Sequence, residues 1–244
     1  MTPRTEATDM RVLALNVQHA GVRRVPLLAA DILGMVPDVV VLSEFLADRS
    51  GLHLLELLRA GGLTGRAHGP KGSIGYPYTV AIASRLPMST ARVPFDGSAY
   101  ATFVLEAEIG GVTVVGLYFP LGREHEPFWD QAFLPFTGTR RDDLAMIAGD
   151  WNTGSRTLDI GGKRVKGMAH FDSTGASGWT DAWRSLHPDQ AEFSWYRQQS
   201  SNGFRLDHAL LSESLAPRLL TSSYAHAPRA SGHTDHSGLM IELR

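Results

Sequence analysis

Polar side chains stand at the end of several short apolar segments of the sequence, and their types are those that perform acid–base and metal chemistry. Several are carboxylates, and the others are two amides, a phenol and an imidazole. In chain order they are Asn16, Glu44, Tyr118, Asp150, Asn152, Asp207, Asp235 and His236. Each alone is commonly a strand terminator or a helix cap. If the segment ends converge at one sheet edge, the set assembles a carboxylate-rich pocket that holds one imidazole.

The ligands and nucleophiles that the sequence offers limit the chemistry of this pocket. Carboxylate oxygens are hard ligands that suit Mg²⁺ or Mn²⁺. A zinc hydrolase is disfavoured because there is no cysteine and no HExxH motif, while His233 and His236 lie in the loop SGHTDHSG. No G-x-S-x-G nucleophile elbow is present either. The remaining groups suit phosphodiester hydrolysis, in which water is deprotonated, phosphoryl charge is stabilised and the leaving alkoxide is neutralised.

Apolar patterning indicates the elements that must position these residues. Short apolar segments between polar residues or glycines are typical of buried strands, and they occur at residues 12–15, 39–42, 80–83, 112–117, 145–148, 206–211 and 239–243. Helical spacing predicts a helix over residues 24–36, and a second helix is expected over residues 52–60. Strands and helices alternate at first and strands then dominate, which favours an α/β or α+β sandwich. We expect a flexible N-terminus at residues 1–10 and a single domain over residues 11–244.

Composition and charge narrow the possible partners. The formal net charge is −2 and the pI about 6.5, so no global basic field marks a nucleic-acid-binding protein. A local cluster, Arg156, Lys163, Arg164 and Lys166, lies in the loop after GDWN and could track a nucleic-acid backbone. No apolar stretch approaches the ~18 residues of a membrane-spanning helix, and the N-terminus lacks the apolar region of a secretory signal. We therefore expect a cytoplasmic protein with no membrane contact and no obligate protein partner.

A few other residues are candidates for the rim of the pocket. Trp195 and Phe204 could stack on nucleic-acid bases, although aromatic residues among apolar neighbours are more often part of a core. His19, three residues after Asn16, is the remaining histidine best placed to line the pocket. Arg205 is interpreted as a member of a structural ion pair, in preference to a phosphate contact.

Several motifs also occur in a characteristic order along nearly the whole chain, namely ALNVQHAG, PDVVVLSEF, GLYFPLG, IAGDWN, FRLDHALLS and GHTDHSG. Together they resemble the endonuclease/exonuclease/phosphatase superfamily, and within it the exonuclease III branch of abasic-site endonucleases. The resemblance implies a two-sheet β-sandwich flanked by helices, the four-layer deoxyribonuclease I-like fold. It places the active site at one edge of the paired sheets.

The resemblance also implies roles for the residues that bind metal and phosphate. Glu44 resembles the metal-binding glutamate of the family, and Asp235 resembles the carboxylate near the metal. Asn16 resembles the site asparagine after the first strand. Tyr118 resembles the tyrosine that contacts the phosphate. The implied cofactor is Mg²⁺ or Mn²⁺.

The remaining residues resemble the groups that move protons. Asp150 and Asn152 resemble the pair that positions or activates the attacking water. Asp207 resembles the carboxylate that orients the catalytic histidine, His236. The implied enzyme is a metal-dependent phosphodiesterase, and the leading hypothesis is a DNA nuclease of the abasic-site endonuclease or 3′-exonuclease type.

Departures from the family pattern keep other substrates open. Ser43 stands where a glutamine usually precedes the metal glutamate, Leu121 replaces a polar residue after YFP, and Gln18 and His19 replace part of a short polar motif. Leu121 and the neutral pI favour the alternative that the same chemistry acts on RNA, a nucleotide or another small phosphoester. A third hypothesis, a non-catalytic binding module, is disfavoured because all the candidate catalytic residues are present.

Overall fold

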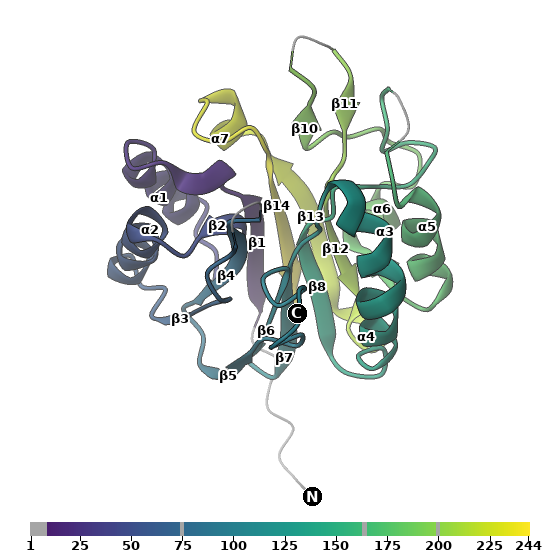
Figure 1. Ribbon diagram of the computed structural model, residues 1–244, viewed down its shortest axis with the longest axis horizontal. Helices are drawn as coiled ribbons and strands as arrows, with labels where there is room; N and C mark the ends of the chain where they lie inside the picture. The colour runs from purple at the N-terminus through teal and green to yellow at the C-terminus, as the bar shows by residue number, and fades with distance from the viewer. Residues whose placement is uncertain (1–8, 74–75, 163–164, 199–200) are drawn as a thin grey trace, which may run out of the picture.

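Two six-stranded mixed sheets pack face to face, with helices on both outer surfaces (Figure 1). The computed structural model describes residues 9–73, 76–162, 165–198 and 201–244. The expected two-sheet sandwich flanked by helices is confirmed. Residues 1–8 of the expected flexible N-terminus lie outside the described residues, while Met10 is already buried at the start of β1 (Met10–Asn16).

The first sheet contains most of the N-terminal strands and both C-terminal strands. Its order is β13-β14-β1-β2-β4-β3. The other bounds are β2 (Val39–Leu46), β3 (Gly65–His68), β4 (Tyr78–Ser84), β13 (Leu219–Ala225) and β14 (Gly238–Leu243). β1 pairs in parallel with β2 and antiparallel with β14, so the ends of β1 and β2 lie at one edge beside the beginning of β14. Both faces of β1 are covered, which explains why its sequence is almost continuously apolar.

The second sheet carries three of the predicted polar residues, Tyr118, Asp150 and Asp207. Its order is β5-β6-β7-β8-β12-β9. The bounds are β5 (Met88–Arg92), β6 (Val104–Ile109), β7 (Val112–Tyr118), β8 (Ala145–Asp150), β9 (Thr180–Asp181) and β12 (Asp207–Leu211). β7 and β8 are parallel, and β12 runs antiparallel to β8 with Asp207 opposite Asp150. The strand predicted at residues 206–211 therefore begins at Asp207.

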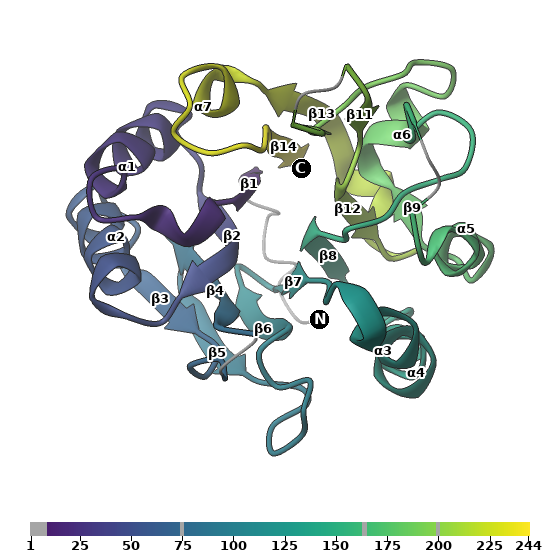
Figure 2. The ribbon, with the colours of Figure 1, turned by 45° about the horizontal axis from the view of Figure 1, so that its top comes forward.

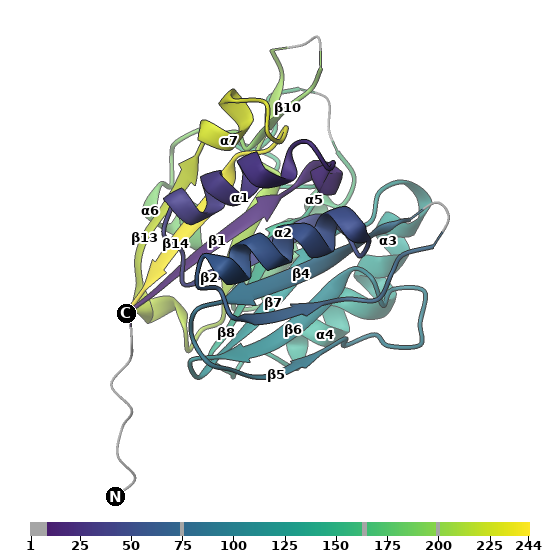
Figure 3. The same cartoon turned by 90° about the vertical axis from the view of Figure 1, so that its left-hand side faces the viewer.

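Helices cover the outer face of each sheet. α1 (Val25–Gly34) and α2 (Arg49–Ala60) lie over the first sheet, as Figure 3 shows. The other helical segments are α3 (His125–Phe128), a π-helical turn (Trp129–Phe133), α4 (Leu134–Gly138), α5 (Met168–Ala176), α6 (Ala182–Leu186) and α7 (Ala227–Ala230). Of these, α3 to α6 flank the second sheet (Figure 2). No helix among the described residues is both long and apolar enough to span a bilayer.

The second helix starts earlier than its apolar spacing indicated. The carboxylate of Asp48 accepts hydrogen bonds from the backbone N–H groups of Ser50 and Gly51 at 2.9 and 3.1 Å. This N-cap satisfies N–H groups that lack a partner in the first turn, so α2 begins at Arg49 and not at residue 52. The cap adds a polar first turn to the helix.

The two sheets approach each other closely where β7 carries a glycine. A Cβ atom at Gly116 would lie 2.6 Å from Val80 Cγ1 and 3.0 Å from Val41 Cγ1, both on the first sheet. The apolar side chains between the sheets form a continuous core, which includes Val12 and Ile147. Close packing of these faces fixes the strand ends of one sheet against those of the other.

Candidate active site

The polar residues predicted from the strand ends converge at one edge of the paired sheets. Asn16, at the end of β1, donates through Nδ2 to Asp150 Oδ2 at 2.8 Å, and Asp150 ends β8 of the other sheet. Ser43 adds a second connection, since its Oγ donates to the carbonyl of Leu117 and accepts from Asp150 N at 3.1 Å. Ser43, which stands where the family usually has a glutamine, thus binds the backbone of Asp150 through its side chain.

Asp207 and His236 form a buried pair between the two sheets. His236 lies in the loop before β14, and its Nδ1 is 2.7 Å from Asp207 Oδ2, as the resemblance implied. Burial alone would lower the pKa of His236, but Asp207, with Asp150 and Asp235, raises it to about 10. The imidazole therefore carries a proton at neutral pH, and its Nε2 is the nitrogen not engaged by Asp207.

Asp150 is a fully buried carboxylate at the edge of the second sheet. It accepts from Asn16 and from Asn152 N, the latter at 2.9 Å. Burial raises the pKa of Asp150 to about 7; the charge on His236 opposes this shift, while Asp207 adds to it. Its carboxylate is thus more basic than that of an exposed aspartate. Asn152 adopts a left-handed conformation with φ 50° and donates through Nδ2 to the Phe119 carbonyl at 2.8 Å.

Glu44 stands at an irregularity of β2 that turns its side chain into the site. The register of β2 against β4 shifts between Leu42 and Phe45, and Glu44 has φ 51°. Tyr118 donates through its hydroxyl to Glu44 Oε1 at 3.2 Å. Burial, with the charge of Glu44, raises the pKa of Tyr118 well above its usual range, so the phenol remains a hydrogen-bond donor.

A cavity of about 300 Å³ adjoins these groups. Its polar lining residues are Glu44, Asn152, Arg197, Asp235 and His236, and its apolar lining residues are Leu121, Val165, Trp195, Phe204 and Leu206. The hairpin of β10 (Trp195–Tyr196) and β11 (Gly203–Phe204) carries the two aromatic residues that the sequence suggested for base stacking. Trp195 is half-buried and accessible, but Phe204 is buried in the core, so its proposed stacking role is wrong. Trp195 has a further contact, because its Nε1 donates to Asp235 Oδ2 at 3.0 Å.

The donor set fits a divalent cation. Ligand atoms of Asp150, Asp207 and His236 lie within 4.8 Å of one another, although Nδ1 of His236 is already engaged by Asp207. Asp207 Oδ1 is buried with no hydrogen-bond partner among the described residues. Glu44 and Asp235, the ligands that the resemblance implied, both line the open cavity. Carboxylate oxygens that water can reach are the donors that hard divalent cations take up most readily.

The predicted phosphate-contacting cluster is described only in part. Lys163 and Arg164 lie outside the described residues. Arg156 is exposed and lies 3.6 Å from Asp172, while exposed Lys166 donates through Nζ to the Gly122 carbonyl at 3.0 Å. Val165, beside Lys166, lines the cavity, so this loop reaches the rim of the site.

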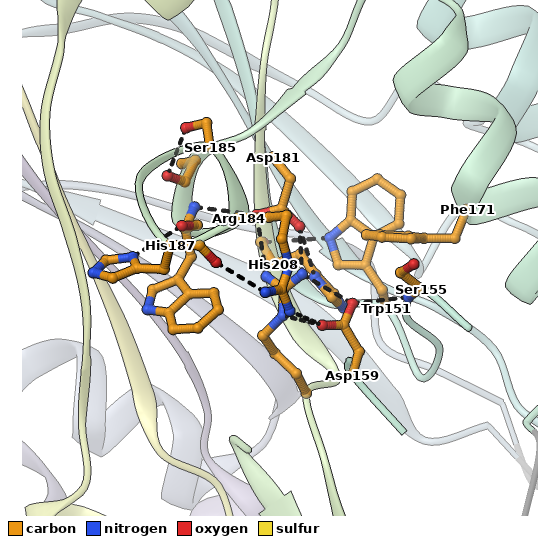
Figure 4. Close-up of polar contacts among 12 residues, drawn as sticks. Trp151, Ser155, Asp159, Phe171, Asp181, Arg184, Ser185, His187 and His208 are labelled. Atoms are coloured by element: carbon orange, nitrogen blue, oxygen red, sulfur yellow. Dashed lines mark hydrogen bonds and ion pairs between the residues drawn. The ribbon is translucent and has the colours of Figure 1, made fainter. Parts of the chain in front are cut away.

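A buried ionic network lies next to β12 (Figure 4). The Arg205 guanidinium binds Asp159 through Nε and Nη2 at 2.8 and 2.9 Å, and Asp181 through Nη1 and Nη2 at 3.1 and 2.7 Å. His208 bridges the Thr153 carbonyl at 2.9 Å and Asp181 at 3.4 Å. Arg205 is thus a structural ion-pair residue, as the sequence suggested from its position beside Asp207, but its partners are Asp159 and Asp181. The network joins the strand of Asp207 to the loop that follows Asp150.

The loop that carries His236 is held by contacts that the sequence did not signal. Thr234 Oγ1 donates to the Asn16 carbonyl at 2.7 Å, and His233 Nδ1 lies 2.6 Å from Asp31 of α1. Arg24 donates to the His233 carbonyl at 2.9 Å. These contacts fix the loop to the end of β1 and to α1.

Comparisons with known proteins agree with this geometry. A family model described as the endonuclease/exonuclease/phosphatase family matches residues 13–229. Exodeoxyribonuclease III of Haemophilus influenzae is 28% identical over an alignment of 276 positions, and this alignment covers 96% of this chain and 100% of that protein. An AP endonuclease from Archaeoglobus fulgidus has a TM-score of 0.82 at 18% identity, and a Neisseria 3′ phosphatase bound to a product DNA hairpin has 0.80 at 21%. Both structures cover 96% of this chain and 99% of their own.

Proposed function

The chain belongs to the endonuclease/exonuclease/phosphatase family, and on that premise we propose that it hydrolyses phosphodiester bonds in DNA. The proposed type is an abasic-site endonuclease or 3′-exonuclease that uses Mg²⁺ or Mn²⁺. The observation that carries the proposal is the Asp207–His236 pair at 2.7 Å, which lies beside the basic carboxylate of Asp150 and opens onto the cavity of Glu44. The full-length match to an exodeoxyribonuclease III supports DNA as the substrate. We also propose that residues 11–244 act as one catalytic domain.

In this proposal, Asp150 accepts a proton from the attacking water. Its raised pKa of about 7 gives the basicity that this transfer needs near neutral pH. Asn16 donates to one carboxylate oxygen and Asn152 N to the other, and these two hydrogen bonds fix the carboxylate plane. The side chain of Asn152 lines the cavity and orients the water.

His236 and Tyr118 stabilise the phosphoryl group. Asp207 holds His236 by Nδ1, so the protonated Nε2 presents a hydrogen bond and a positive charge to a phosphoryl oxygen. Tyr118 remains a neutral donor and contacts a second oxygen. A divalent cation bound by Glu44 and Asp235 would supply Lewis-acid stabilisation of the negative charge on the pentacoordinate phosphoryl group and on the leaving 3′-oxygen.

The rim of the cavity provides the contacts that select DNA. Trp195 offers an apolar ring face to the nucleotide next to the scissile phosphate, whereas the ring of Phe204 is buried and packs against Trp195. Arg156 and Lys166 of the described residues, with Lys163 and Arg164, would contact the flanking backbone. Because the net charge is −2, these local cations carry the electrostatic attraction.

A substrate panel tests the proposal. The purified chain is assayed with Mg²⁺ or Mn²⁺ on duplexes with an abasic site, a recessed 3′ end or a 3′-phosphate, and on single-stranded DNA, RNA and bis-nitrophenyl phosphate. We expect metal-dependent cleavage of a DNA duplex that leaves a 3′-hydroxyl, and its loss in EDTA and in Glu44→Gln. Glu56→Gln, on the exposed face of α2, is the matched control and should keep full activity. Hydrolysis of RNA or the small diester with every DNA substrate intact would refute the DNA assignment.

A further inference from the structure

A short left-handed turn after β1 brings an imidazole against Glu44. Gln18, His19 and Ala20 have φ values of 44°, 68° and 40°, and none of them is a glycine. The turn places His19 Nε2 3.5 Å from Glu44 Oε2. Tyr78 packs edge-on against the ring, with centroids 4.6 Å apart, and its hydroxyl lies 3.2 Å from the same nitrogen. The imidazole is therefore held in one orientation, toward the carboxylate.

Of the side chains in this turn, that of His19 is the one that faces the site. Gln18 is committed elsewhere, because its Oε1 accepts from Arg24 Nη1 at 2.7 Å. Glu44 Oε1 accepts from Tyr118, so Oε2 is the oxygen that remains available beside His19. The His19 side chain is 40% exposed, so an ion pair with Glu44 would be strongly screened by water and would stabilise the fold little.

The separation of the two atoms is close to that of two ligands on one ion. Ligand atoms that each lie about 2.1 Å from an octahedral divalent cation are about 3 Å apart in adjacent positions, so the 3.5 Å between His19 Nε2 and Glu44 Oε2 needs to shorten by only about 0.5 Å. We propose that His19 Nε2 and Glu44 Oε2 bind the same divalent cation, and that the site therefore prefers Mn²⁺ to Mg²⁺. The inference rests on the proposed function only in taking Glu44 as a metal ligand.

The preference follows from the chemistry of the nitrogen. Mg²⁺ favours oxygen ligands and gives up water reluctantly, whereas imidazole nitrogen binds first-row transition ions well. An all-oxygen site would discriminate little between the two ions. A single histidine beside the glutamate adds affinity for Mn²⁺ that Mg²⁺ does not share.

Metal binding by the full chain tests this without any assay of turnover. Protein labelled with ¹⁵N-histidine is titrated with Mn²⁺, and electron paramagnetic resonance gives the affinity and the hyperfine coupling to bound nitrogen. Competition with Mg²⁺ gives the affinity ratio. We expect a directly bound histidine nitrogen in the unchanged protein. His19→Ala should abolish that coupling and reduce the Mn²⁺ affinity about 10–100-fold, with a much smaller change for Mg²⁺.

Three further variants make the result decisive. His53→Ala, an exposed histidine of α2, should leave coupling and affinity unchanged. His19→Asp supplies an oxygen donor in place of the imidazole and should raise the affinity for Mg²⁺ relative to the affinity for Mn²⁺. Nitrogen coupling that persists in His19→Ala, or an equal loss for both ions, would overturn the inference. Mn²⁺ binding that survives in Glu44→Gln would refute the proposed metal site itself, whereas loss there with no effect of His19→Ala refutes only the role of His19.

Discussion

Replacement of Arg205 by methionine should destabilise the protein strongly and reverse the pH dependence that Asp159 and Asp181 contribute to its stability. Arg205 is fully buried and makes four hydrogen bonds to the carboxylates of Asp159 and Asp181. Its guanidinium carbon also lies 5.2 Å from the centre of the Trp183 ring. The unbranched methionine side chain keeps much of this packing, so Arg205→Met removes mainly the charge and the hydrogen bonds.

The size of the stability loss in Arg205→Met depends on the charged partners that Asp159 and Asp181 retain. Removing one partner of a buried ion pair costs about 3–5 kcal/mol, because the other charge is left without compensation. Asp159 retains Arg184 at 2.6 Å and Asp181 retains His208 at 3.4 Å, which prevents the cost from doubling. We therefore expect about 3–5 kcal/mol at pH 7, a large part of the 5–15 kcal/mol typical of folded domains.

The contribution of Asp159 and Asp181 to the pH dependence of stability has opposite signs in the two proteins. Burial alone would raise the pKa of Asp181, but Arg205 and His208 hold it well below its usual range; Arg205 likewise lowers the pKa of Asp159. This stabilisation is present above the unfolded pKa of about 3.9 and is lost as the pH falls below it. In Arg205→Met, burial dominates and raises both pKa values. The folded variant then binds the extra protons, and the contribution of the two carboxylates to its stability increases from pH 8 toward pH 5.

Urea unfolding at pH 8, 6.5 and 5, followed by tryptophan fluorescence, measures both effects. Arg59→Met removes an exposed pair with Glu56 that water screens, and it should leave stability close to that of the unchanged protein at each pH. Should Arg205→Met fail to fold, Arg205→Lys keeps the charge with fewer contacts and should show an intermediate loss. A loss below about 1 kcal/mol, or a variant whose deficit does not shrink on acidification, would refute the reasoning.

Three other changes probe separate parts of the molecule. His236→Ala should reduce turnover about 10²–10⁴-fold while circular dichroism remains that of a folded protein, and a loss below tenfold would contradict its role in the proposed mechanism. Neutralising Arg156 and Lys166 should flatten the slope of log affinity for duplex DNA against log salt by about 0.9 for each phosphate that the protein no longer neutralises; an unchanged slope means that other residues bind the backbone. Gly116→Ala should cost about 1–3 kcal/mol in urea unfolding, because the added methyl would lie 2.6 Å from Val80 Cγ1; unchanged stability would argue against this close approach of the sheets.

The strands and their polar ends could be predicted from the sequence because burial on both faces demands apolar residues. A polar residue that ends such a segment, as Asn16 and Asp150 do, is then conspicuous. Their hydrogen bond joins positions 134 residues apart, and only the packing of the two sheets brings them together. The pairing of His236 with Asp207 was accessible through the family resemblance and not through spacing.

Other contacts had no sequence signal at all. The approach of His19 to Glu44 depends on a left-handed turn that contains no glycine, which is the usual indicator of positive φ. Arg205 finds Asp159 and Asp181 at sequence separations of 46 and 24 residues. The hairpin strands that carry Trp195 contain two residues each, too few for periodicity to reveal.

The site lies across the boundary between the two sheets, and this makes catalytic competence a late event in folding. Asn16 and Glu44 belong to the first sheet, whereas Tyr118, Asp150 and Asp207 belong to the second. His236 enters with β14, which follows every other strand in the sequence. A half-folded chain with either sheet intact therefore holds no complete set of the proposed catalytic groups. Under the proposed mechanism, hydrolysis begins only when the sheets dock, so partly folded molecules would not nick DNA.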